Sequence, residues 1–105
     1  MKFGQRILEQ ADRLATFTED EGRLTRTYLT ACHRKPGDQI AEWMREAGMQ
    51  AGFDALGNVV GRYAAAQPGG PTVLTGSHMD SVVDAGRYDG IFGILTAIAC
   101  VRAIT

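Results

Sequence analysis

Residues 72–98 read TVLTGSHMDSVVDAGRYDGIFGILTAI, and the change of pattern along this stretch indicates the fold class. Residues 72–75 are short, mostly apolar and rich in β-branched side chains, as is typical of a strand buried in an α/β sheet. From Ile91 onward apolar residues recur at helical spacing with Arg102 as the only charge, so we expect a helix that is buried nearly all round. A strand, a polar loop and a helix in this order predict an α/β layer structure.

Two amphipathic helices are expected upstream, over residues 3–17 and 30–47, because apolar residues there recur three and four positions apart. Thr30 is a suitable N-cap for the second helix, and Gly48 is the glycine expected just after its end. The second helix contains the tripeptide KPG at residues 35–37, and both proline and glycine disfavour a helix interior. We therefore expect a break there, with a new helical segment opening at the proline.

The region that follows the second helix is expected to hold β structure and a loop. In residues 53–63, FDALGNVVGRY, a turn sequence precedes a β-branched apolar pair, which predicts a short hairpin or a strand entered through a tight turn. Residues 67–71, QPGGP, are typical of a surface loop. The expected fold class is thus α/β, with an incomplete sheet and flanking helices.

Length and charge limit the possible functions. The chain has 105 residues, 11 basic and 12 acidic, and a formal net charge of -1. This length is enough for one small domain or part of one, and the interspersed charges do not favour binding to nucleic acid or to an anionic membrane. The N-terminus lacks the apolar core of a signal peptide, and the apolar run near the C-terminus is too short to span a bilayer. We expect a soluble protein.

The cysteines and the last residues add two expectations. Cys32 and Cys100 lie far apart in expected helices, which favours buried, reduced thiols and a cytoplasmic location over a disulfide framework. The sequence stops at Thr105 within a helical pattern, which we interpret as the end of one portion of a larger protein.

The polar loop between strand and helix carries the candidate chemistry. Residues two apart at a strand end point to the same side, so His78 and Asp80 should face one spot while Met79 points away. Asp89 lies directly before the helix. A histidine and two carboxylates brought together in a buried loop would repel one another or be costly to desolvate, so they require a neutralising cation. Imidazole and carboxylate together suit zinc, manganese, cobalt or nickel better than calcium. We predict His78 as a metal ligand, Asp89 as a carboxylate bridging two ions, and Asp80 as the acid that orients the histidine.

Simpler interpretations of the same loop remain open. Asp89 is also well placed to be an ordinary helix N-cap, where free N–H groups and the helix dipole favour a carboxylate. Gly90 and Gly93 could simply allow close helix packing, and Asp84 and Arg87 have the character of ordinary solvated loop residues.

The stretch GSHMDSVVDAGRYDG, followed by IFGILTAI, resembles the metal-site segment of the allantoate amidohydrolase and N-carbamoyl-L-amino acid hydrolase family, a branch of the dinuclear metallopeptidase-like amidohydrolases. The upstream stretches IAEWMREAGM and FDALGNVVGRY are similar to the same family, so the resemblance covers roughly residues 20–104. It implies that residues 1–105 are the N-terminal part of a zinc-peptidase-like α/β catalytic domain. It also implies a cytoplasmic homodimer that uses two divalent metal ions to hydrolyse a linear ureido C–N bond in a small-molecule substrate, either allantoate or an N-carbamoyl-L-amino acid.

Carried over by position, the resemblance assigns a metal-ligand role to His78, a bridging role to Asp89, and the orienting catalytic acid to Asp80. The family also uses a pair of adjacent glutamates and further histidines, and after Asp89 this sequence contains neither Glu nor His. The other histidine, His33, is expected at the surface. We therefore expect the 105-residue chain to be inactive by itself and to bind metal weakly.

Two further hypotheses stand beside the hydrolase. The chain could be a truncated, catalytically inactive remnant or a subunit fragment without activity of its own. It could also be a small nucleotide-binding module with residues 86–93 as a phosphate loop, although that stretch lacks both the P-loop lysine and the dinucleotide glycine pattern.

Overall fold

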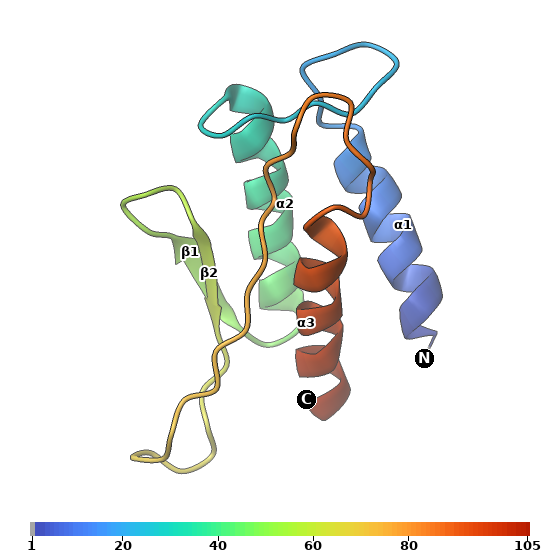
Figure 1. Ribbon diagram of the computed structural model, residues 1–105. Coiled ribbons are helices and arrows are strands. Elements are labelled where there is room, and N and C mark those ends of the chain that lie inside the picture. Colours follow the sequence, from blue (N-terminus) through green and yellow to red (C-terminus); the bar gives the residue numbers. More distant parts are fainter. Residues whose placement is uncertain (1) are drawn as a thin grey trace.

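The computed structural model describes residues 2–105, which form three helices and one two-stranded sheet (Figure 1). In chain order the elements are α1 (Phe3–Ala15), α2 (Ala31–Glu46), β1 (Gln50–Phe53), β2 (Val59–Arg62) and α3 (Ile91–Ile104). All the predicted helices and the predicted hairpin are present. None of the three helices in residues 2–105 combines the length and the apolar character needed to cross a membrane.

Helix α2 begins and ends where the sequence predicts. The Thr30 side chain accepts a hydrogen bond from the backbone N–H of His33, as an N-cap does, and Gly48 takes a positive φ of 97° just after the helix. The predicted break at residues 35–37 is wrong, because α2 runs unbroken through Pro36. Pro36 is fully buried, and a Cβ added at Gly37 would lie 2.8 Å from the Phe53 ring. Burial of the proline and close approach of the hairpin offset the helix-propensity cost of these two residues.

The two strands form an antiparallel hairpin that packs on α2. Gln50 pairs with Arg62 and Phe53 with Val59. The turn between them is closed by Asp54, whose carboxylate accepts hydrogen bonds from the backbone of Leu56 and Asn58. The Asn58 side chain also donates to this carboxylate at 2.8 Å, and this bond, together with those from the backbone, lowers the pKa of Asp54 below its usual value.

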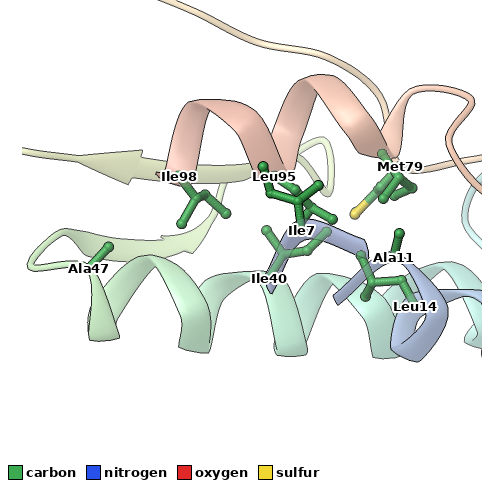
Figure 2. Close-up of a cluster of buried hydrophobic side chains, with 9 residues drawn as sticks. Ile7, Ala11, Leu14, Ile40, Ala47, Met79, Leu95 and Ile98 are labelled. Carbon is green, nitrogen blue, oxygen red and sulfur yellow. The ribbon is translucent and has the colours of Figure 1, made fainter. Parts of the chain in front are cut away.

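The core lies between α1, α2 and α3 (Figure 2). Helix α1 contributes the apolar stripe that its periodicity predicts, and α3 contributes one face only. Figure 2 shows the Met79 side chain in the same layer, next to the start of α3. The buried apolar residues of this cluster are Ile7, Ala11, Leu14, Ile40, Ala47, Met79, Ile91, Leu95 and Ile98.

Residues 72–75 differ from the prediction. They run as an extended coil and form no strand within the described chain, and Val73 and Leu74 are 94% and 91% exposed. A β-strand is defined by its hydrogen-bonded neighbour, and in residues 2–105 this segment has none. The expectation of a buried strand is therefore wrong for the chain as it stands, although its extended backbone is as predicted.

Helix α3 is also less buried than expected. Ile91, Leu95 and Ile98 face the core, whereas Phe92 and Ile104 are more than half exposed. Cys32 is half-buried and Cys100 is exposed, so the expected burial of both thiols is wrong, although both are free as predicted. Cys100 lies on α3, where the buried residues are Ile91, Leu95 and Ile98.

Candidate functional site

The candidate site lies where the extended segment reaches the start of α3. Met79 is 7% exposed and belongs to the core, whereas the side chains of its two neighbours, His78 and Asp80, are 52% and 44% exposed. This alternation is the predicted one, with the two polar side chains on one side of the backbone and the methionine on the other.

The three predicted site residues are close together. His78 Nδ1 lies 2.9 Å from the backbone carbonyl oxygen of Asp80 and 3.4 Å from its carboxylate Oδ1. On the other edge of the ring, His78 Nε2 lies 3.3 Å from Oδ1 of Asp89. The imidazole thus stands between two carboxylates that come from positions nine residues apart in the loop.

The described chain does not hold a complete metal shell. Within residues 2–105, no three of the His, Cys, Asp and Glu side chains are placed to hold one ion together. The donors that converge number two, His78 Nε2 and the Asp89 carboxylate, because Asp80 lies at the opposite ring nitrogen. A metal ion at this place would need further ligands from outside the described residues.

The start of α3 is built around two glycines. Its N-cap is Gly90, which has a φ of 78° and makes no side-chain capping bond, so the interpretation of Asp89 as an ordinary N-cap is wrong. A Cβ on Gly90 would lie 2.3 Å from the His78 carbonyl oxygen, and one on Gly93 would lie 2.9 Å from Cβ of Ser77. The Ser77 hydroxyl also donates to the Gly90 carbonyl at 2.7 Å. The close packing that these glycines allow brings α3 against the histidine.

Arg26 is a buried residue near the site that sequence reasoning missed. It is 1% exposed, and its Nε donates to the carbonyl oxygen of Met79 at 2.8 Å. Desolvation lowers the pKa of Arg26, and the nearby negative charge of Asp80 opposes that shift. Its sequence context is polar and typical of a surface arginine, so no signal in the sequence distinguishes it.

His33 is buried, so its expected surface position is wrong. It is 6% exposed at the first turn of α2, its Nδ1 accepts the backbone N–H of Leu29 at 3.1 Å, and the Tyr28 ring contacts it edge-on. Burial lowers the pKa of His33; the charge of Asp80 opposes this shift and that of Arg26 adds to it. The ring is therefore held neutral, with Nδ1 as an acceptor.

An open cavity of about 470 Å³ lies beside the candidate site. It lies between the hairpin, the extended segment, α2 and α3, and His33, His78 and Asp80 all line it. The hairpin side is apolar, with Val59 and Val60 on the wall. Polar groups at one end and apolar walls at the other are typical of a small-molecule site.

The two loop residues interpreted as solvated are exposed, as predicted. The Arg87 side chain is 51% exposed and forms an ion pair with Asp12 of α1. Asp84 is exposed at a φ of 53°, and its backbone N–H donates to the Thr25 hydroxyl at 3.0 Å. Neither side chain contacts the His78 imidazole.

Comparison with known proteins defines the class. No protein-family model matches the chain. The fold is similar to a hydantoinase/carbamoylase family amidase from Burkholderia ambifaria, with a TM-score of 0.87 and 34% identity over 96% of this chain and 25% of that one. The chain is thus homologous to part of an amidase of this class.

Curated relatives make the comparison more specific. Allantoate deiminase 1 of Glycine max is 43% identical over 91 residues, which are 87% of this chain and 19% of the relative. N-carbamoyl-L-amino-acid amidohydrolase of Pseudomonas sp. (strain NS671) is 41% identical over 88 residues, 84% of this chain and 21% of the relative. The curated homologues thus include allantoate deiminases and N-carbamoyl-L-amino-acid amidohydrolases, and the chain spans about a fifth of the length of these two relatives.

Proposed function

We propose that this chain supplies one part of the metal-dependent active site of an amidohydrolase that cleaves a linear ureido C–N bond. The proposed substrates are allantoate or an N-carbamoyl-L-amino acid, which are the compounds in the names of its homologues. The observation that carries the proposal is the position of the His78 ring, with Nε2 3.3 Å from the Asp89 carboxylate and Nδ1 bound by the backbone of Asp80.

The donor pair fits a transition-metal ion. Two ligands that each lie about 2.0–2.1 Å from a tetrahedral zinc ion are about 3.3 Å apart. His78 Nε2 and Asp89 Oδ1 have this separation, and both belong to a donor set that zinc and manganese accept, as do cobalt and nickel. Asp89 has a second carboxylate oxygen, which supports the proposed bridging role toward a second ion.

The ring nitrogens of His78 have the roles that a ligand needs. Nδ1 lies 2.9 Å from a carbonyl oxygen, which only accepts, so Nδ1 carries the proton and donates it. Nε2 is then left with its lone pair free, which is the form of imidazole that binds metal. The Asp80 carboxylate lies 3.4 Å from Nδ1, on the side of the ring opposite Asp89, so the proposed role of Asp80 is to orient the histidine.

When bound, the ions would polarise the substrate carbonyl and lower the pKa of an attacking water. The chain's own residues hold the imidazole in one tautomer, place a carboxylate beside it, and line a cavity large enough for a small molecule. After Asp89 the sequence has no Glu or His that could serve as the general base or complete the metal shells. We therefore expect no hydrolysis by the isolated 105 residues.

The proposal has three further parts, which concern the domain, the oligomeric state and the compartment. We place residues 1–105 in the N-terminal part of the catalytic domain, and we propose a homodimer for the complete enzyme. The two free thiols support a reducing compartment, the cytoplasm. The competing hypothesis is an inactive remnant, for which the segment would no longer support catalysis in any context.

A chimera distinguishes the hydrolase hypothesis from the inactive-remnant hypothesis. Residues 2–105 of this chain would replace the matching segment of Glycine max allantoate deiminase 1, and the release of product from allantoate would be measured with zinc or manganese present. We expect a chimera with activity that the His78→Ala substitution abolishes. The matched control is Asp84→Asn, an exposed aspartate of the same loop, which should leave the activity unchanged. A folded chimera without activity would support the inactive remnant.

A further inference from the structure

Arg26 is a buried charged side chain that has no carboxylate in ion-pair contact among the described residues. It is 1% exposed, and no ion pair involving it occurs within residues 2–105. Burial of an unpaired guanidinium is costly, so its hydrogen bonds must compensate for the lost water. The hydrogen bonds that compensate for this cost therefore indicate the structural role of Arg26.

The guanidinium binds three backbone carbonyls from two separate segments. Nε donates to Met79 at 2.8 Å, and Nη1 donates to Leu14 at 2.7 Å and to Phe17 at 3.1 Å. Leu14 lies in the last turn of α1 and Phe17 just follows it, whereas Met79 lies in the candidate site. One planar side chain therefore ties the end of α1 to the residue between His78 and Asp80.

The backbone of Arg26 is attached to the same loop. Its N–H donates to the Ser81 hydroxyl at 2.7 Å, and its carbonyl accepts the Ser81 N–H at 2.7 Å. Two residues earlier, the Leu24 carbonyl accepts the N–H of Ala85 at 2.7 Å. Hydrogen bonds to residues 24–26 thus hold the backbone of residues 79–85 in place.

The geometry at Met79 transmits this constraint to the site. The Met79 side chain is locked in the core and its carbonyl is bound by Arg26, so the backbone of this residue is fixed at both points. His78 and Asp80 are its direct neighbours, and their side chains leave the backbone on the opposite side. Rotation of the Met79 peptide would turn both side chains away from their present positions.

We propose that Arg26 is the positioning residue of this site: by holding the Met79 carbonyl it aims the His78 imidazole at Asp89. The inference rests on the proposed metal site for its functional meaning. Lysine could keep the charge but has no planar fork, so it could not reach the three carbonyls in the same directions.

The test uses the full chain and two readouts. In the metal-free protein, ¹⁵N NMR of the imidazole reports the protonation of the two His78 nitrogens. In the second readout, cobalt(II) is titrated in and its d–d absorption reports both affinity and ligand geometry. Arg26→Met and Arg26→Lys are compared with Arg23→Met, a matched control because Arg23 is an exposed arginine whose side chain pairs only with Asp20 in the described chain.

We expect Arg26→Met to mix the His78 tautomers and to weaken cobalt binding by about 10- to 100-fold, the range found for residues that orient metal ligands. Arg26→Lys should lie between Arg26→Met and the wild type, and Arg23→Met should match the wild type. If Arg26→Met does not fold, Arg26→Lys decides by the same two readouts.

The two proposals fail in different ways. A wild-type chain in which cobalt shows no interaction with His78, not even the weak binding expected from two ligands, would overturn the proposed metal site, and the metal-free NMR comparison would then still decide the role of Arg26. Variants that lose thermal stability but keep the wild-type His78 spectrum and, where cobalt binds, its affinity would overturn the positioning role.

Discussion

The α carbon of Gly90 lies against His78: a Cβ at this position would stand 2.3 Å from the His78 carbonyl oxygen and 2.7 Å from its Nδ1. The helix that begins at Ile91 therefore starts so close to His78 that the preceding residue has no room for a side chain. Because Asp89 directly precedes this glycine, the same close approach brings the Asp89 carboxylate within 3.3 Å of Nε2. The position of the helix start determines the geometry of the candidate site.

Substitution of Gly90 tests this relationship. Gly90→Ala introduces both a strained positive φ of 78° and a clash with His78, and we expect a loss of about 2–5 kcal/mol in the free energy of unfolding. Gly69→Ala is the control, because Gly69 has a φ of 89° but nothing within 4 Å of the added Cβ. Its loss should be limited to the backbone strain, about 1–2 kcal/mol. Urea denaturation measures both, and equal losses would contradict the close contact.

Gly37 tests why α2 continues through its proline. In an open helix position, glycine to alanine stabilises by up to about 1 kcal/mol. Gly37→Ala should instead destabilise by about 1–3 kcal/mol, because the new methyl group would lie 2.8 Å from the Phe53 ring. Gly4→Ala in α1 has nothing within 4 Å and should be neutral or stabilising. A stabilising Gly37→Ala in thermal unfolding would disprove the tight contact between α2 and the hairpin.

His33 predicts a pH dependence of stability. Its pKa is lowered in the folded chain by burial, so the unfolded chain takes up the proton first as the pH falls. The stabilising effect of the neutral ring is complete above about pH 6.5 and is lost as the pH falls below that value. We expect the free energy of unfolding to decrease between pH 7.5 and pH 5.5, and to decrease less in His33→Gln. An identical decrease in both proteins would show that His33 does not titrate between the two states.

The carboxylates whose pKa is lowered affect the free energy of unfolding in a lower pH range than His33 does. Hydrogen bonds from Thr27 lower the pKa of Glu19, and those from Asn58 lower the pKa of Asp54. Their contribution is present at neutral pH and is lost only as the pH falls below their ordinary values, near 4. The window between pH 7.5 and pH 5.5 therefore reports on His33 rather than on these carboxylates.

Local patterns predicted most of the fold because they depend on neighbours in sequence. The helix periodicities, the Thr30 cap and the hairpin turn at Asp54 are all properties of a few consecutive residues. The continuity of α2 could not be predicted in this way, because it depends on Phe53 packing against Gly37. The exposure of Val73 is a second example, since a strand needs a partner that the described residues do not provide.

For the candidate site, too, contacts between residues close in sequence could be predicted, and contacts between distant residues could not. His78, Asp80 and Asp89 lie within twelve residues, so strand alternation and a helix start were sufficient to predict that they meet. Arg26 is more than fifty residues from Met79 and has an ordinary surface-like sequence context, so only the folded chain reveals their contact. The basic neighbours Arg34 and Lys35 predict a surface position for His33, yet in the first turn of α2 its side chain is buried.

The most direct test of the central claim is a crystal of the chain soaked in zinc, with anomalous scattering measured at the zinc edge. We predict a peak about 2.0–2.1 Å from both His78 Nε2 and an Asp89 carboxylate oxygen, and its loss in His78→Ala. A crystal in which these two side chains point to different places, or in which zinc binds elsewhere and His78→Ala leaves the peak unchanged, would contradict the account.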